Sequence, residues 1–473
     1  MDSNTVLEIF REITRIPRES GHEEKMTAYL LDFAKKHNLE SKRDATGNVV
    51  IIKEATPGKE NVPTLVLQGH QDMVCEKLKD SAHNFETDPI DYVIEDGWMI
   101  AKETTLGADD GIGVAACLAL LQSDLPMGRL ECLFTISEET GMDGAMALEP
   151  GFITGKTLIN LDSEDEGELF VGCAGGVNTT AEFTYGTEPV KEGYDIVRIH
   201  LFNAIGGHSG DDINKERANT VQQMARFLYT EMPDIQIIHL EGGGKHNAIA
   251  RECEATVAVP DAMAFFRRFE QFGKAVNKEF SVSDPDIKYT YESVDDASLE
   301  AVDAKSADRL ISCLTAIFHG VLSMSQDIKG LVETSSNLAS VRMGEGRVNV
   351  CTSQRSSVES AKRFVADKVA ACFKLAGASV KHSEPYPGWK PDMDSHILKV
   401  CFDSYVKLFG HEPKVKAIHA GLECGLFLEK FPDLDMISFG PTLRGVHEPG
   451  EKLDLASNEK FVRHLVDVVT NFC

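Results

Sequence analysis

The side chains best suited to chemistry in this sequence stand next to apolar segments that have the pattern of strands. His70 and Asp72 follow one such segment, and because strand side chains alternate, both face the same way. Other imidazole and carboxylate groups occupy similar positions further along the chain. In open α/β sheets ligands bind beyond the carboxyl ends of the strands, so these groups predict one shared site. The set comprises His70, Asp109, Glu139, Asp162 and His447.

This mixture of imidazole and carboxylate donors is typical of a site for divalent metal ions. Imidazole suits zinc, and carboxylates also accept cobalt or manganese. Two ions about 3.5–4 Å apart need one carboxylate as a bridge. Asp72 is placed to hold the second nitrogen of His70. Glu138, beside a ligand but directed away from it, is placed to take a proton from water, which predicts metal-assisted hydrolysis of an amide.

Each of these residues also has an ordinary structural interpretation. His70, with Asp72 two residues later, can belong to a surface turn, and Asp109 can be a helix N-cap. Glu138 and its neighbour can interact with a helix dipole. Asp162 begins an acidic segment that can be a solvated loop. His447, considered alone, does not indicate a functional site. The metal site is favoured by the conjunction of the five groups.

The order of segments predicts an α/β fold. Helical periodicity marks 5–15, 23–37 and 111–124, whereas 130–136 and 157–162 are apolar segments of strand length. Strands that alternate with helices indicate a mostly parallel sheet with helices on both faces.

The middle of the chain has a different pattern. After about residue 180 the strands alternate with period two, which indicates an antiparallel sheet with one solvated face. A similar order of segments recurs from about residue 287, which suggests a doubled unit, and 383–396 has the composition of a linker. The predicted domains are a catalytic domain at 1–180 with 386–473, and an inserted α+β lid domain at 181–385.

Composition limits the partners and the compartment. The chain carries 48 Lys and Arg against 75 Asp and Glu, a net charge of −27, which disfavours nucleic acids and anionic membranes as partners. Eleven cysteines without a CxxC pair favour a reducing compartment. Because the sequence has no apolar run of about 18 residues, we expect a cytoplasmic protein with no membrane segment.

A family resemblance extends over almost the whole chain. The motifs that carry it come in order: GHQDMV, TTLGADDGIG, SEETGMDGA, NLDSE, GGHSGDDI, NAIARE, PGWKPD and HAGLECG. The sequence resembles the di-zinc metallopeptidase superfamily of aminoacylases, carboxypeptidases and dipeptidases. Within it, the chain is similar to the aminoacyl-histidine dipeptidase branch, also called Xaa-His dipeptidase, cytosol non-specific dipeptidase or peptidase D.

The resemblance implies a division of the metal ligands. His70 and Asp162 would bind one ion, and Glu139 and His447 would bind the second. Asp109 would bridge the two. Zn²⁺ is the first expectation for both sites, with Co²⁺ or Mn²⁺ as alternatives.

The resemblance also implies which residues act on the substrate. Glu138 would be the general base, and His208 of the lid would stabilise the oxyanion. Asn247 and Arg355 would bind the substrate, and Glu423 would hold its free amine. A homodimer is expected on the same ground.

The implied activity is hydrolysis of unblocked dipeptides, including Xaa-His, by water activated between two metal ions. One alternative is an amidohydrolase or carboxypeptidase acting on N-acyl amino acids or longer peptides, and another is a non-catalytic peptide-binding relative. Four positions depart from the family pattern and bear on substrate preference. They are Asp110, Ser137, Ala250 and Gly450.

Overall fold

The computed structural model describes residues 1–296 and 298–473, and the chain divides into two compact units. The first unit comprises 1–172, 391–417 and 422–473, and the second comprises 173–390 and 418–421. The sequence places the domain boundaries at 180 and 386, and the catalytic and lid roles of the two parts stay predictions.

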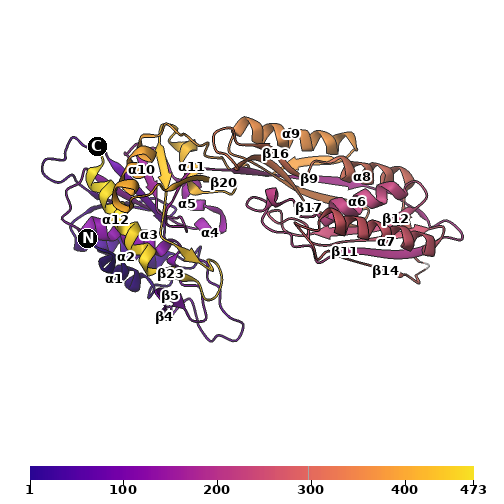
Figure 1. The fold of residues 1–473 in the computed structure, drawn as a ribbon, viewed down its shortest axis with the longest axis horizontal. Coiled ribbons are helices and arrows are strands. Elements are labelled where there is room, and N and C mark those ends of the chain that lie inside the picture. The colour runs from indigo at the N-terminus through magenta and orange to yellow at the C-terminus, as the bar shows by residue number, and fades with distance from the viewer. Residues whose placement is uncertain (297) are drawn as a thin grey trace. The chain divides into compact units, whose positions relative to one another are not determined.

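The first unit contains an eight-stranded sheet (Figure 1). Its strands are β1 (Glu40–Arg43), β2 (Val49–Lys53), β3 (Leu65–His70), β6 (Leu130–Thr135), β7 (Thr157–Asn160), β8 (Glu168–Cys173), β20 (Lys414–Ile418) and β21 (Asp435–Ser438). They run in the order β1-β2-β6-β3-β7-β21-β8-β20. The four neighbours β6, β3, β7 and β21 are parallel. The predicted α/β class is confirmed, and the structure adds antiparallel pairs on either side of the parallel centre.

Burial explains why these segments form the centre of the sheet. All residues of β3, β6 and β7 are buried, which matches their nearly continuous apolar sequences. A smaller sheet of four strands comprises β4 (Tyr92–Glu95), β5 (Trp98–Ala101), β22 (Leu443–Arg444) and β23 (Lys452–Asp454).

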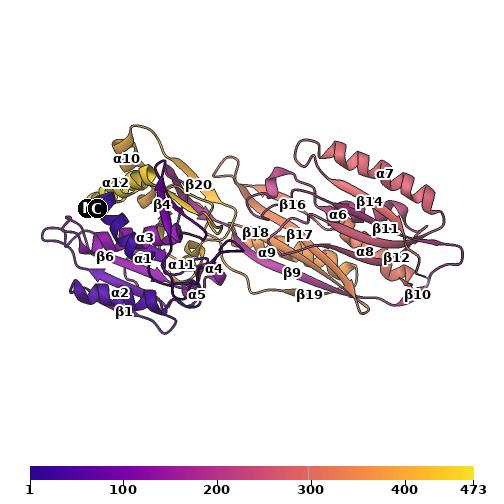
Figure 2. The ribbon, with the colours of Figure 1, turned by 90° about the horizontal axis from the view of Figure 1, so that it is seen from below.

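Eight helices of the described residues belong to the first unit. They are α1 (Ser3–Ile13), α2 (Glu24–Lys36), α3 (Ala108–Gln122), α4 (Glu138–Gly141), α5 (Asp143–Ala147), α10 (His396–Phe409), α11 (Glu423–Lys430) and α12 (Leu455–Asn471). Helix α3 packs on β3, and α1 lies beside both α3 and α12 (Figures 1 and 2). Helix α3 is buried along almost its whole length, as its apolar sequence predicts. None of the helices in the described part of the chain has the length and apolar character needed to cross a membrane.

The buried histidine of α12 makes the stability of the first unit depend on pH. Burial lowers the pKa of His464 to about 4, and its Nε2 lies 2.8 Å from the carbonyl oxygen of Cys401 in α10. Between pH 6.5 and pH 4 the unfolded chain therefore binds a proton at this position that the folded chain excludes. Stability is lost as the pH falls through that window, by about 2 kcal/mol at pH 5 from this residue.

The change His464→Phe should reduce this loss, because phenylalanine keeps the aromatic contacts with Tyr405 and Phe439 but does not titrate. Urea unfolding at pH 7.5 and pH 5 measures the effect. An equal loss of unfolding free energy in the variant and the wild type would contradict the assignment.

The second unit is built on one nine-stranded sheet. Its strands are β9 (Gly175–Thr184), β11 (Asp195–Phe202), β12 (Gln236–Gly243), β13 (Cys253–Val259), β14 (Lys288–Ser293), β16 (Gly320–Met324), β17 (Val332–Gly344), β18 (Arg347–Ser356) and β19 (Ser379–His382), and β10 (Thr187–Pro189) pairs separately with β15 (Glu300–Val302). Its helices are the 3-10 turn η1 (Ile213–Lys215), α6 (Thr220–Glu231), α7 (Ala262–Glu279), α8 (Ala304–Ala316) and α9 (Glu359–Leu375). Figure 2 shows the long strands β9, β17 and β18 side by side.

The strand order of this sheet reveals a doubled arrangement. One half has the order β14-β11-β13-β12, and the other has β19-β9-β18-β17. With strands numbered by sequence within each half, both read 4-1-3-2, the antiparallel order of a split βαβ unit. Strands β12 and β17 join the halves. The doubled unit suggested by the sequence is therefore visible, although β9 precedes the first half in the chain.

The predicted linker at 383–396 is more ordered than its composition suggests. Tyr386 and Trp389 pair through backbone hydrogen bonds with Gly176 and Cys173, all within the second unit. Trp389 is buried. The chain passes from the second unit to the first only after Lys390.

Candidate metal centre

Three parallel strands bring the first predicted ligands to one edge of the sheet. His70 is the last residue of β3 and is in register with Thr135, the last residue of β6. Helix α4, which carries Glu138 and Glu139, follows β6 directly, and Asp162 follows β7. Because β6, β3 and β7 are parallel neighbours, their carboxyl ends lie side by side.

His70 is the centre of the first group of ligands. Its imidazole is fully buried, and its Nε2 lies 3.0 Å from Oδ1 of Asp109 and 3.6 Å from Oδ1 of Asp162. Burial alone would lower the pKa of His70, but the charge of Asp162 and the hydrogen bonds to the surrounding carboxylates raise it well above its usual value. The donor atoms of these three residues lie within 4.8 Å of one another.

His447 is the centre of the second group. It lies in the loop between β22 and β23, and its Nε2 is 2.9 Å from Oε1 of Glu139 and 3.3 Å from Oδ2 of Asp109. These two hydrogen bonds raise the pKa of His447 to about 10. The Asp109 carboxylate thus presents Oδ1 to His70 and Oδ2 to His447, which is the arrangement a bridging ligand needs.

Asp72 fixes the positions of several groups at this edge. Its side chain and backbone oxygens lie 3.4 and 3.2 Å from Nδ1 of His70. The same carboxylate accepts hydrogen bonds from the backbone N–H groups of Glu138 and Glu139, at 3.1 and 3.2 Å, and from the Ser20 hydroxyl at 2.8 Å. Burial alone would raise the pKa of Asp72, but the hydrogen bond and charge of His70, with the hydrogen bonds from Ser20 and the Glu138 N–H, lower it to about 2. A charged Asp72 therefore orients His70 and the start of α4 together.

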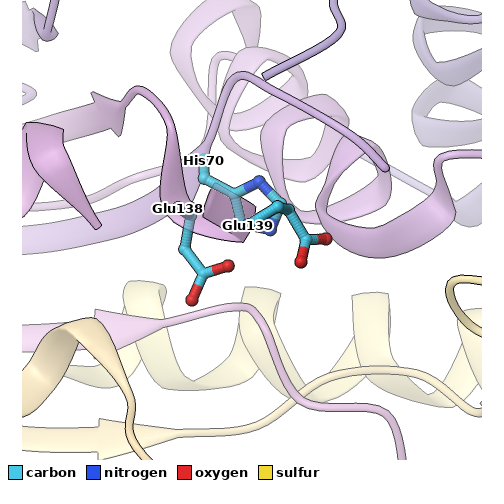
Figure 3. Close-up of side chains that lie close together, drawn as sticks. All are labelled: His70, Glu138 and Glu139. Atoms are coloured by element: carbon cyan, nitrogen blue, oxygen red, sulfur yellow. The ribbon is translucent and has the colours of Figure 1, made fainter. Parts of the chain in front are cut away.

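Glu138 and Glu139 are adjacent, but their side chains diverge. Figure 3 shows the two carboxylates pointing in different directions beside the His70 ring, although an oxygen of each lies within 4.8 Å of the other and of a ring nitrogen. Glu139 reaches His447, whereas Glu138 makes no such contact. Burial raises the pKa of Glu138 well above its usual value, with the charges of Glu423, Glu139 and Asp109 acting in the same direction. The carboxylate of Glu138, with its raised pKa, accepts a proton readily.

The residues present fit a pair of divalent cations. Four carboxylates and two imidazoles converge in three overlapping groups: His70, Glu138 and Glu139; His70, Asp109 and Asp162; Asp109, Glu139 and His447. Burial and mutual repulsion raise the pKa values of Asp162 and Glu139. Neutral imidazole and carboxylate oxygen are the donors that zinc and similar ions prefer. A divalent cation would offset the repulsion among these carboxylates.

Three predicted substrate residues lie in the second unit. The backbone N–H of Ser209, next to His208, donates to the carbonyl oxygen of Asn247 at 2.8 Å. Arg355 is buried, and its Nε lies 3.4 Å from the Ser209 hydroxyl. Its Nη1 donates to the Tyr386 hydroxyl at 2.8 Å. The second unit therefore gathers His208, Asn247 and Arg355 around Ser209.

The residues that follow His208 contact one nitrogen of its ring, Nδ1. The N–H groups of Gly210 and Asp211 both point to Nδ1, at 3.3 Å. The carboxylate oxygen Oδ2 of Asp211 also lies 3.4 Å from Nδ1, so two backbone N–H groups and a carboxylate contact this nitrogen. Nε2 has no partner among the described hydrogen bonds, and a ring that carries a hydrogen there presents an N–H donor, the group that an oxyanion requires.

Glu423 lies in the first unit, at the start of α11. One of its oxygens accepts hydrogen bonds from Gln68 Nε2 at 2.7 Å and from the Thr135 hydroxyl at 3.0 Å. Burial raises the pKa of Glu423 to about 7. Its predicted role with a substrate amine stays a prediction, because these contacts are internal to the protein.

Three residues near the predicted sites had no role in the sequence interpretation. Arg18 donates to the carbonyl oxygen of Asp72 at 2.6 Å, Glu451 contacts the segment before Asp109, and Tyr386 contacts Arg355. Tyr386 stood in the predicted linker. Each of these residues contacts a group that is distant in the sequence or has no recognisable spacing from it. The local sequence pattern therefore does not predict these contacts.

Comparison with known proteins identifies a family and two groups of relatives. The profile described as Peptidase family M20/M25/M40 matches residues 66–471. The cytosol non-specific dipeptidase of Escherichia coli (strain K12) is 39% identical over 455 residues, which cover 95% of this chain and 94% of that protein.

Two solved structures resemble this chain over nearly its full length. The crystal structure of aminoacylhistidine dipeptidase from Vibrio alginolyticus superposes with a TM-score of 0.93 at 39% identity, covering 99% of this chain and 96% of that one. Aminopeptidase PepT from Bacillus cereus superposes with a TM-score of 0.63 at 16% identity, covering 99% and 98%. The latter likeness concerns the fold alone.

Proposed function

We propose that this chain, which belongs to Peptidase family M20/M25/M40, is a metal-dependent dipeptidase that hydrolyses unblocked dipeptides, including Xaa-His. The proposal depends most on one observation. A single carboxylate, Asp109, presents one oxygen to His70 and the other to His447. The relatives from Escherichia coli and Vibrio alginolyticus, whose names state dipeptidase activity, support the same substrate class.

We assign the cations to two positions that share Asp109. His70 and Asp162 would complete one position, and Glu139 and His447 the other. Bound divalent ions would polarise the peptide carbonyl and make the attacking water more acidic. Zn²⁺ is our first assignment because imidazole is a preferred zinc donor, with Co²⁺ and Mn²⁺ as alternatives.

The protein's own groups would move the proton. Glu138 accepts it from the attacking water and returns it to the leaving amine, because its carboxylate is near the ligands and is not engaged by His447. Asp72 keeps His70 and the first residues of α4 in place during this transfer.

The second unit would contribute binding groups. His208 would donate from Nε2 to the developing oxyanion. Arg355 would bind the free carboxylate of the dipeptide through its guanidinium fork, held in orientation by Tyr386. Asn247 would bind the substrate beside them, and Glu423 would bind the free amine.

The change Arg355→Met should raise the KM for a free dipeptide about 10–100-fold, because a hydrogen bond to a charged group stabilises binding by about 1.5–3 kcal/mol. The kcat should change less, since the carboxylate is remote from the reacting carbonyl. Steady-state kinetics on a dipeptide and on its C-terminal amide measure this. The amide should be a poor substrate for the wild type and should lose little further in the variant. An unchanged KM for the free dipeptide would remove Arg355 from the binding site.

A substrate panel separates the proposed function from its alternatives. Free dipeptides, N-acetylated dipeptides, N-acyl amino acids and tripeptides are compared at equal concentration after loading with Zn²⁺. A dipeptidase cleaves the first class and loses activity when the amine is blocked. Preferential cleavage of N-acyl amino acids or longer peptides would favour an amidohydrolase or carboxypeptidase, and no cleavage of any class would favour a non-catalytic relative.

We also infer a cytoplasmic homodimer from the family resemblance. The cytosolic relative of Escherichia coli supports the compartment. Light scattering after size exclusion should give twice the chain mass of 51.9 kDa. A mass equal to one chain at micromolar concentration would contradict the dimer.

A further inference from the structure

The last predicted metal ligand and the predicted bridge come from opposite ends of the sequence, and one buried side chain connects their loops. Glu451 stands four residues after His447 and is 2% exposed. Its Oε2 accepts hydrogen bonds from the backbone N–H groups of Leu106 at 2.7 Å and Gly107 at 2.9 Å. Its Oε1 accepts from Ala108 at 2.8 Å and Asp109 at 3.3 Å.

Four consecutive N–H groups directed at one carboxylate determine the conformation of the segment that ends at Asp109. Two backbone hydrogen bonds strengthen the same connection. The Gly450 N–H donates to the carbonyl oxygen of Thr104, and the Ala101 N–H donates to the carbonyl oxygen of Glu451, both at 3.0 Å. The loop that carries His447 is thereby tied to the segment that carries Asp109.

A second buried residue holds the same segment from its carbonyl side. Arg18 donates through one nitrogen to the carbonyl oxygens of Gln71 and Asp72, at 3.1 and 2.6 Å, and through the other to the carbonyl oxygen of Gly107. Gly107 has a φ of +67°, and a Cβ there would lie 2.5 Å from the Arg18 guanidinium. Only glycine combines this backbone conformation with this close approach.

We propose that Glu451 is a positioning residue for the metal centre. Its carboxylate holds the Leu106–Asp109 segment so that Asp109 presents one oxygen to His70 and one to His447. Glu451 itself contacts backbone amides and none of the predicted metal ligands' side chains in the described hydrogen bonds. The inference rests on the proposed metal site and adds a residue to it that binds neither ion nor substrate.

The change Glu451→Gln tests this role with little change in side-chain size. The amide keeps one acceptor oxygen, but its NH₂ group then faces two backbone N–H donors. The affinity for Zn²⁺ should fall about 10–100-fold, the range typical of partners that orient metal ligands. It is measured by competition with a chromogenic zinc chelator, without substrate. The kcat on a dipeptide should fall, with a smaller change in KM.

Glu131 provides a matched control. It is also buried in the first unit, and its carboxylate accepts hydrogen bonds from the backbone N–H groups of Thr154 at 2.7 Å and Gly155 at 3.1 Å. It lies on β6 at the opposite end from Thr135. Glu131→Gln should lower the melting temperature but keep the zinc affinity of the wild type, which separates loss of stability from loss of positioning.

Each result decides the inference. Wild-type zinc affinity and kcat in Glu451→Gln would overturn it. If that variant does not fold, Glu451→Asp, which keeps the charge on a shorter side chain, is measured in the same way, and wild-type affinity there would overturn it. A wild-type chain that binds no Zn²⁺ would overturn the metal site and this inference together. A chain that binds Zn²⁺ but cleaves no dipeptide would overturn the proposed function alone. The positioning role of Glu451 would then still be tested by the zinc affinity of its variant.

Discussion

Replacing Glu138 with glutamine is expected to lower kcat on a dipeptide by about 10²–10⁴-fold, the usual contribution of a general base. Glutamine has nearly the same shape but cannot accept the proton from water. The metal content should stay unchanged, because the carboxylate of Glu138 diverges from that of Glu139 (Figure 3). Steady-state kinetics and elemental analysis of the same preparation measure both quantities.

The control for this change is Glu149→Gln, which alters an exposed glutamate shortly after α5. It should leave kcat and metal content as in the wild type. Normal turnover in Glu138→Gln would contradict the general-base role. A loss of metal from Glu138→Gln would instead identify Glu138 as a metal ligand. Its carboxylate is close enough to His70 and Glu139 to bind the same ion.

The second large effect is expected from Asp109→Asn. Asparagine removes the negative charge that both imidazoles face, and its NH₂ group points a donor at one of them. Zn²⁺ affinity should fall by more than about 100-fold, which exceeds the effect of partners that merely orient ligands. Activity should be lost with it. Calorimetric titration of the apoprotein with Zn²⁺ measures the affinity.

A control at the other end of the same helix is Asp124→Asn, an exposed position two residues beyond α3. It should bind Zn²⁺ as the wild type does. If Asp109→Asn still bound two ions with wild-type affinity, the bridging assignment would be wrong.

The sequence contained enough information for the α/β class and for one part of the site. Strands β3, β6 and β7 are short apolar segments whose length and flanking residues mark them clearly. Because they are parallel, the polar residues that follow them had to meet at one edge. His70, Glu138 and Asp162 could therefore be grouped from pattern alone, although their roles stay predictions.

Other residues could not be placed in the same way. Asp109 lies in the first turn of α3 and His447 lies in a loop, so no rule about strand ends predicts that one carboxylate would face both imidazoles. The sequence pattern grouped both residues with the other candidate ligands, and only the family resemblance assigned Asp109 as the bridge. Glu451 could not be recognised in the sequence because its proposed role depends on hydrogen bonds to four backbone N–H groups more than 300 positions earlier in the chain.

The directions and pairing of the strands at the edges of the sheets also could not be predicted from the local sequence pattern. Strands β1, β2 and β8 are antiparallel to their neighbours, whereas the alternation of strands and helices indicates only the parallel centre. In the second unit the doubled strand order includes β9, which is separated from the rest of its half by more than 100 residues. Pairing over such distances depends on the whole fold.

The most direct measurement is anomalous diffraction at the zinc absorption edge from crystals of the Zn²⁺-loaded protein. Two peaks should appear about 3.5–4 Å apart, one beside His70 and the other beside His447, with the Asp109 carboxylate between them. A single peak, or peaks remote from both imidazoles, would contradict the paired cations on which the proposed activity depends.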